Sequence, residues 1–198
     1  MTASQPFTSA LVMSNPKMFR YEWIWEKDNG TNFPSVNFQP FRVHECVLVF
    51  GNFSTTFSKN GRYNYNPQFE KGKPYKCVSG NAVRDGLRHD SKIQSGNYET
   101  INDGKRYPRS VIKFSKDKNK IHPTQKPVAL FEYLIKTYTN EGETVLDNCA
   151  GSGTTGIACI NTNRNYILME KEEKYYDIIN DRIKQHTHLK VNTTNNFF

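Results

Sequence analysis

The chain has 198 residues, of which 36% are hydrophobic and 13% aromatic, and its formal net charge is +8. This length allows one domain or a domain with an inserted lobe, and the aromatic content argues against a disordered polar chain. No segment approaches the roughly 20 apolar residues of a membrane helix, and the N-terminus lacks the basic and apolar regions of a secretory signal. We therefore expect a cytoplasmic protein without a membrane partner, and four widely spaced cysteines without a CxxC pair predict no metal site.

The first fifty residues contain short elements of mixed character. Residues 7–13 include an apolar run ahead of Asn15-Pro16 and predict a short helix. Residues 21–26 alternate aromatic or apolar side chains with others, which predicts a strand, and a second strand is expected over 43–50. The intervening 29–40 is typical of a loop.

The positive charge is concentrated in one central segment. Residues 51–120 contain 15 Lys and Arg against 6 Asp and Glu, a net charge of +9, whereas the rest of the chain has a net charge of −1. Tyrosines are interleaved with these basic residues, and no helical period is present. This pattern favours an insert that binds a polyanion such as the backbone of a nucleic acid. The alternative is a flexible loop whose tyrosines fill a small local core.

The last third of the chain has the most regular hydrophobic pattern. Apolar residues at helical spacing predict a helix that begins after Pro127, and a short buried strand follows at 144–147. A glycine-rich turn then leads into a second helix. Another strand is expected at 165–170 and an amphipathic helix over about 174–185, and the polar residues 192–196 are expected to fray. This order of elements predicts an α/β fold with parallel strands joined by helical crossovers.

The glycine-rich turn, residues 151–156, satisfies the pattern G-x-G-x-x-G between a strand and a helix, and Glu170 ends the next strand. Glycines allow a ligand to approach the backbone closely, and a carboxylate can accept hydrogen bonds from both ribose hydroxyls, so a nucleotide-type site is predicted. ATP is excluded because Gly153-Thr154-Thr155 lacks the lysine of a P-loop. NAD fits poorly because most of the chain precedes the glycines. S-adenosylmethionine remains, since its adenosine needs the same ribose clamp without a pyrophosphate site.

Two motifs resemble those of a known family. Residues 147–155, Asp-Asn-Cys-Ala-Gly-Ser-Gly-Thr-Thr, resemble the Asp-Pro-Phe-x-Gly-Ser-Gly-Thr-Thr cofactor motif of bacterial and phage DNA amino-methyltransferases, and residues 122–127 are similar to the His-Pro-Thr-Gln-Lys-Pro element of that family. The resemblance implies a Rossmann-like S-adenosylmethionine methyltransferase fold. It also implies that Lys126 neutralises the cofactor carboxylate, whereas His122 has either a cofactor-binding role or a capping or packing role. The cofactor-binding residues implied are His122, Thr124, Gln125, Lys126, Asp147, Ala150, Gly151, Ser152, Gly153, Thr154 and Glu170.

The resemblance extends over nearly the whole chain. Segments 4–8, 22–27 and 42–45 are similar to stretches that follow the family's catalytic motif, which is the permuted order with cofactor binding last. The implied divisions are a partial methyltransferase core over 1–50, a basic target-recognition insert over 51–120, a cofactor-binding part over 121–190 and a tail over 191–198. Double-stranded DNA is the implied partner. The candidate phosphate-contacting residues are Arg84, Arg88, Lys105, Arg106 and Arg109.

The family's catalytic motif, Asp/Asn/Ser-Pro-Pro-Tyr/Phe/Trp, is absent, because no Pro-Pro occurs in the 198 residues. In the family this motif orients the exocyclic amine, stacks on a base flipped from the duplex, and follows a strand beside the one that ends at Asp147. We therefore expect an incomplete parallel sheet and no catalytic residue in this chain. The enzyme is expected to be truncated, or split and completed by a separately encoded N-terminal half.

The resemblance implies transfer of a methyl group from S-adenosylmethionine to an exocyclic amine of a flipped base, with adenine N6 favoured. Cytosine N4 stays open because the distinction depends mainly on the first residue of the missing motif. A catalytically inactive DNA-binding remnant is a further alternative. A methyltransferase that acts on a small molecule is disfavoured by the basic central segment.

Overall fold

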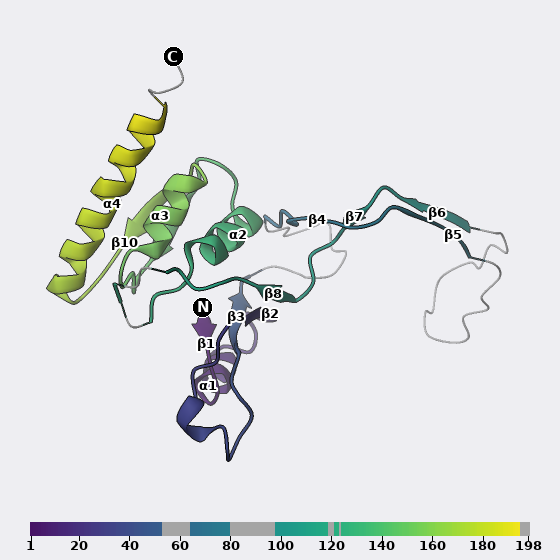
Figure 1. The fold of residues 1–198 in the computed structure, drawn as a ribbon, viewed down its shortest axis with the longest axis horizontal. Coiled ribbons are helices and arrows are strands. Elements are labelled where there is room, and N and C mark those ends of the chain that lie inside the picture. The colour runs from purple at the N-terminus through teal and green to yellow at the C-terminus, as the bar shows by residue number, and fades with distance from the viewer. Residues whose placement is uncertain (53–63, 80–97, 119–120, 123, 195–198) are drawn as a thin grey trace. The chain divides into compact units, whose positions relative to one another are not determined.

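The structure is a computed structural model that describes residues 1–52, 64–79, 98–118, 121–122 and 124–194 (Figure 1). The chain divides into two compact units. The first comprises Met1–Asn66 together with Arg109–Phe198, and the second comprises Pro67–Pro108. The predicted insert boundaries at 51 and 120 stay a prediction.

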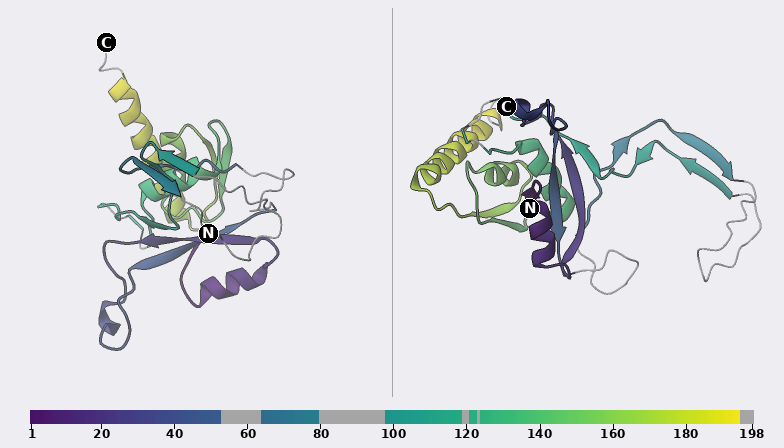
Figure 2. Two further views of the ribbon diagram at one scale, coloured as in Figure 1. Left: turned by 90° about the vertical axis from the view of Figure 1, so that its right-hand side faces the viewer. Right: turned by 90° about the horizontal axis from the view of Figure 1, so that it is seen from below.

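Four strands of the first unit form one sheet in the order β1–β3–β2–β8. Their bounds are Thr2–Ala3 for β1, Phe19–Glu26 for β2, His44–Phe50 for β3 and Val111–Lys113 for β8. β3 pairs antiparallel with both β1 and β2, and β2 pairs parallel with β8. The short helix and the two strands predicted over the first fifty residues are confirmed, with α1 at Phe7–Ser14 and a 3-10 turn at Phe33–Ser35 in the predicted loop. Figure 2 gives two further views of these elements.

The C-terminal part of the first unit is a parallel β–α–β arrangement flanked by two more helices. The bounds are Val128–Tyr138 for α2, Thr144–Asp147 for β9, Thr154–Asn161 for α3, Asn165–Leu168 for β10 and Glu173–Thr194 for α4. β9 and β10 pair in parallel, which confirms the predicted crossover. None of the described helices combines the length and apolarity needed to cross a membrane.

The end of the last helix corrects the sequence analysis. The helix was expected over about 174–185 with a frayed tail from Asn192, but α4 continues to Thr194. The extension is polar, yet it contains neither Gly nor Pro, and Thr187 Oγ1 donates to the carbonyl of Ile183 one turn earlier. No helix-breaking residue therefore ends the helix at the point where the apolar stripe ends.

Helix α2 connects the two hydrophobic clusters of the first unit. Its Leu130 is fully buried in a cluster with Trp23 and Trp25 of β2, and its Ile135 packs with Ala158 and Cys159 of α3. Both indole N–H groups have partners, because that of Trp23 donates to the Tyr138 hydroxyl at 2.5 Å and that of Trp25 donates to the Phe114 carbonyl at 2.9 Å. One helix therefore fixes the four-stranded mixed sheet against the α3 layer.

The second unit consists of short antiparallel ladders, seen in Figure 1. Strand β4, Glu70–Lys71, pairs with β7, Lys105–Arg106, and strand β5, Tyr75–Ser79, pairs with β6, Tyr98–Asn102. The sequence analysis assigned no strands to this segment, because its residues lack the regular alternation of apolar and polar side chains that is typical of a half-buried strand. Gly104 supplies the turn before β7, with φ +96° and its N–H donating to Asn102 Oδ1 at 2.9 Å.

Candidate cofactor site

The glycine-rich turn joins the end of β9 to the start of α3. Gly151 and Gly153 have φ of +55° and +75°, left-handed conformations that favour glycine. A Cβ at Gly153 would lie 3.2 Å from carbons of Ile179, so the turn packs closely against α4. Ser152 and Thr154 are buried, at 3% and 5% exposure. The turn therefore has a fixed shape that the sequence specifies with its two glycines.

Two carboxylates at the ends of the parallel strands hold this turn. Asp147, at the end of β9, accepts hydrogen bonds from the Cys149 N–H at 3.1 Å and from the Thr155 hydroxyl. Glu170, after β10, accepts hydrogen bonds from the backbone N–H of Gly151 at 2.8 Å and from the backbone N–H groups of Lys171 and Glu172. The backbone N–H of Glu172, with those of Gly151 and Lys171, holds the pKa of Glu170 below its ordinary range. Glu170 is therefore a carboxylate beside the glycine-rich turn, at the strand end where the sequence analysis placed it.

The loop before α2 lies against the glycine-rich turn. Gln125 Oε1 accepts a hydrogen bond from the Ser152 hydroxyl at 3.3 Å, and its Nε2 donates to Asp117 Oδ2 at 3.1 Å. The His122 Nδ1 accepts from the Thr124 N–H at 3.2 Å, and a Cβ at Gly151 would lie 3.7 Å from His122 Nε2. The two motifs, which 19 residues separate in the sequence, are thus in direct contact.

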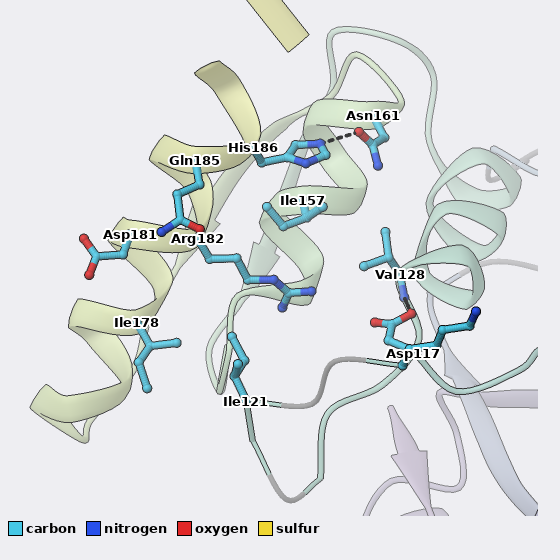
Figure 3. A pocket seen from close by; sticks show the side chains of 11 residues that line it. Asp117, Ile121, Val128, Ile157, Asn161, Ile178, Asp181, Arg182, Gln185 and His186 are labelled. Atoms are coloured by element: carbon cyan, nitrogen blue, oxygen red, sulfur yellow. Dashed lines mark hydrogen bonds between the residues drawn. The ribbon is translucent and has the colours of Figure 1, made fainter. Parts of the chain in front are cut away.

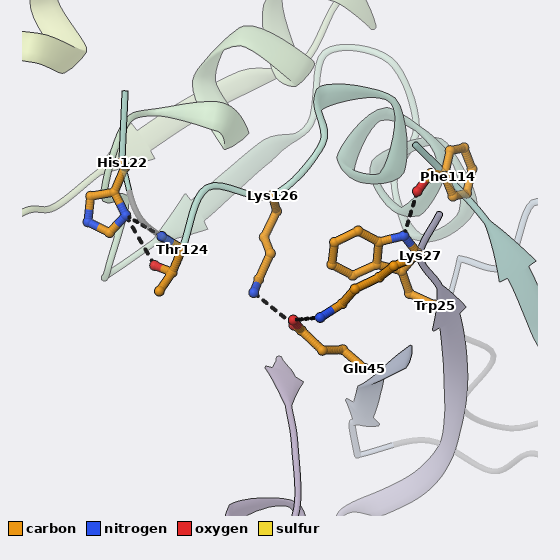
Figure 4. Close-up of polar contacts among 7 residues, drawn as sticks. All are labelled: Trp25, Lys27, Glu45, Phe114, His122, Thr124 and Lys126. Atoms are coloured by element: carbon orange, nitrogen blue, oxygen red, sulfur yellow. Dashed lines mark hydrogen bonds and ion pairs between the residues drawn. The ribbon is translucent and has the colours of Figure 1, made fainter. Parts of the chain in front are cut away.

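Lys126 has an ionic partner that the sequence analysis missed. Its Nζ donates to Glu45 Oε2 at 2.7 Å, while the other oxygen of Glu45 pairs with Lys27 (Figure 4). Both ammonium groups lie near the ring of Trp25, at 5.8 and 5.2 Å from its centroid. Burial alone would raise the pKa of Glu45, but the two lysines outweigh burial and lower it.

One cavity of about 830 Å³ brings these features together. Of the eleven predicted cofactor-binding residues, ten line it: His122, Thr124, Gln125, Lys126, Asp147, Ala150, Gly151, Ser152, Thr154 and Glu170. Gly153 does not line the cavity, and a Cβ at this position would point toward Ile179 of α4. The volume lies within the range of small-molecule and cofactor pockets.

Arg182 on α4 supports the same turn from the side of a second cavity, of about 700 Å³ (Figure 3). Its guanidinium donates to the Ser152 carbonyl at 2.9 Å and to the Thr154 hydroxyl at 3.2 Å. Sequence reasoning missed this residue, because an arginine on an amphipathic helix is ordinarily a surface charge.

The predicted DNA-contacting residues have unequal surroundings. Arg84 and Arg88 lie outside the described residues. Lys105 is exposed, with its ammonium 4.0 Å from the ring centroid of Phe69, and Arg109 is exposed as well. Arg106 is half-buried, donates to Asn102 Oδ1 and to backbone carbonyls, and stacks on Tyr75. These contacts indicate that Arg106 holds the β4–β7 region together.

Comparison with known proteins places this geometry in a family. The DNA methylase family (N6_N4_Mtase) matches residues 5–181. The chain is 28% identical over 191 residues to the type II methyltransferase M2.MboI of Moraxella bovis, covering 88% of this chain and 68% of that protein. It is 33% identical over 175 residues to M.HindIII of Haemophilus influenzae, covering 80% of this chain and 53% of that protein.

Other relatives match over shorter stretches. M.BglI of Bacillus subtilis is 43% identical over 67 residues, and M.HpaI of Haemophilus parainfluenzae is 38% identical over 74, so the match spans 19% and 24% of their lengths. Among solved structures, the M1.HpyAVI–SAM complex is similar with a TM-score of 0.57 and 25% identity, over 91% of this chain and 71% of that one. The predicted Rossmann-like methyltransferase fold is confirmed, and the chain belongs to the DNA methylase family.

Proposed function

We propose that the chain binds S-adenosylmethionine in the 830 Å³ cavity, as the cofactor-binding part of an enzyme that methylates an exocyclic amine of DNA. The observation that carries this proposal is the convergence of ten predicted residues, from three separate segments, on one cavity. When bound, the cofactor supplies a methyl group on a positively charged sulfur. The DNA methylase family match and the similarity to the M1.HpyAVI–SAM complex support the same cofactor and substrate.

The groups that line the cavity fit the chemistry of this cofactor. A carboxylate offers about four lone-pair sites, so Glu170 keeps about one site for a ribose hydroxyl beside its three backbone N–H partners. Gly151 has no Cβ between the turn and His122, which leaves room for a ligand against the backbone. Lys126 supplies the positive charge that a cofactor carboxylate requires.

The open sheet supports a further strand between β9 and β1. Within the described part of the chain, β9 pairs with β10 alone and β1 with β3 alone, yet Leu146 of β9 and Thr2 of β1 line the same cavity. Leu146 and its register partner Ile167 are 60% and 51% exposed, although parallel sheets are ordinarily buried on both faces. We propose that this strand carries the Asp/Asn/Ser-Pro-Pro-Tyr/Phe/Trp motif of the family. It comes either from the same polypeptide or from a separately encoded N-terminal half.

We propose double-stranded DNA as the substrate and adenine N6 as the methylated atom, with cytosine N4 as the alternative. The net charge of +9 over residues 51–120 supports binding to the phosphate backbone. Lys105 and Arg109 are exposed and able to contact phosphates. Arg84 and Arg88 are proposed on their sequence alone.

Methyl transfer from radiolabelled S-adenosylmethionine to duplex DNA tests the proposal. The 198-residue chain is expected to bind the cofactor but to transfer no methyl group by itself. Addition of a polypeptide with the catalytic motif is expected to start transfer, and mass spectrometry of the nucleosides then identifies N6-methyladenine or N4-methylcytosine. Robust transfer by the chain alone would overturn the proposed additional strand. Absence of transfer with the added polypeptide, despite DNA binding, would favour a DNA-binding remnant.

A further inference from the structure

Lys27, Glu45 and Lys126 form an ionic triad behind one wall of the cavity (Figure 4). Lys27 is only 4% exposed, which is rare for a lysine, and its ammonium pairs with Glu45. The side chains of Glu45 and Lys126 are 15% and 21% exposed. The three residues come from the end of β2, from β3 and from the loop before α2, so the triad exists only in the folded chain.

The triad has one positive charge in excess. Two ammonium groups share a single carboxylate, and each is also near the face of Trp25. Charges that are largely removed from water interact more strongly than exposed ones, so this excess is weakly screened. Of the three residues, Lys126 lines the cavity and the other two do not. The Lys126 ammonium is therefore the group of the triad that presents positive charge to a ligand in the cavity.

We propose that Lys27 and Glu45 determine how strongly the cavity selects a ligand with a carboxylate. Glu45 is the internal counter-ion of Lys126, and the amino-acid carboxylate of the cofactor competes with it. Lys27 offsets the charge of Glu45, so that Lys126 still attracts the ligand. Neither Lys27 nor Glu45 touches the cofactor, and each acts through Lys126 as a positioning residue. This inference rests on the proposed cofactor.

The test compares two ligands that differ only in the carboxylate, S-adenosylmethionine and decarboxylated S-adenosylmethionine. Calorimetry gives a Kd for each ligand. The Kd of the decarboxylated ligand divided by that of the intact ligand measures the selectivity for the carboxylate. Lys126→Met is expected to bring the ratio close to one. Glu45→Gln removes the competing anion and is expected to raise the ratio about tenfold, the scale of one nearby charge in a partly buried site. Lys27→Met leaves Glu45 to Lys126 alone and is expected to lower the ratio by a similar factor.

Two further variants keep the test decisive. Lys113→Met removes one exposed positive charge that pairs with Glu26, so its ratio is expected to equal that of the wild type within about twofold. The double variant K27M/E45Q removes both other members of the triad and leaves neither Lys27 nor Glu45 buried without its partner, so it remains informative if a single variant does not fold. Because the removed Glu45 is in contact with Lys126 and the removed Lys27 is not, the ratio is expected to exceed that of the wild type.

The outcomes separate this inference from the proposed function. If neither ligand binds the wild-type chain, the proposed cofactor is wrong and the inference fails with it. If both bind with a ratio near one, the cofactor proposal stands but Lys126 does not meet the carboxylate, which overturns the inference. Glu45→Gln and K27M/E45Q variants that weaken both ligands equally, with an unchanged ratio, would reduce the triad to a structural role. Opposite shifts of the ratio in Glu45→Gln and Lys27→Met would support it.

Discussion

Replacement of Gly153 by alanine is expected to disturb the glycine-rich turn through two separate effects. Its φ of +75° lies in the left-handed region, where an L-residue is less stable by about 1–2 kcal/mol. The new Cβ would also lie 3.2 Å from two carbons of Ile179, which is 5% exposed and cannot move freely. Such overpacking typically destabilises by about 1–3 kcal/mol. The two effects together predict a loss of about 2–5 kcal/mol in the free energy of unfolding.

Gly142 provides a matched control for the backbone effect. Its φ is +80°, and a Cβ there would have no neighbour within 4 Å, so Gly142→Ala should lose only about 1–2 kcal/mol. Urea unfolding followed by the fluorescence of the buried Trp23 and Trp25 measures both variants. Because the turn also lines the cofactor cavity, Gly153→Ala should weaken S-adenosylmethionine binding by at least about tenfold, and Gly142→Ala should not. Equal losses of stability in both variants, or unchanged binding in Gly153→Ala, would refute this account of the turn.

Four more variants test separate contacts. Arg182→Met removes the charged donor to Ser152, so calorimetry should show about tenfold weaker S-adenosylmethionine binding, and unchanged binding would contradict its supporting role. The pKa of Glu45 is lowered in the folded chain, so the stability that this carboxylate contributes is present above its unfolded pKa and is lost as the pH falls through the lower folded pKa. Urea unfolding from neutral to acidic pH should therefore show the wild type losing its advantage over Glu45→Gln in acid; an advantage that persists there would count against the ion pairs. Lys105→Met should reduce the salt dependence of duplex binding by about one ion, whereas Arg106→Met should also reduce the thermal stability of the β4–β7 region; identical behaviour of the two would contradict their different surroundings.

The local parts of the site could be predicted from the sequence. The two glycines of the turn, the strand before it and Glu170 at the next strand end are all encoded within about twenty-five residues, and their pattern fixes both shape and ligand type. The family resemblance assigned the loop at 122–127 to the same cofactor site, and the structure brings the loop and the turn together through Gln125 and Ser152.

The contacts that were missed join residues far apart in sequence. Lys27 lies in a charged stretch that is typical of a surface loop, and Glu45 is one acidic residue at the start of a strand, so neither pattern indicates an ion pair with Lys126. Arg182 on α4 was missed for the same reason, because its hydrogen bond to Ser152 exists only when α4 packs against the glycine-rich turn. The strands of the second unit were missed because β4 has two residues and the alternation of β5 is weak.

The cavity between the two motifs is proposed to bind S-adenosylmethionine. Ultraviolet crosslinking of methyl-labelled S-adenosylmethionine to the 198-residue chain, followed by peptide mapping, tests it directly. The label is expected in peptides that contain residues 122–126, 145–155 or 170, and excess unlabelled S-adenosylmethionine should prevent its attachment. Label confined to other peptides, or no competition by the unlabelled cofactor, would contradict the claim.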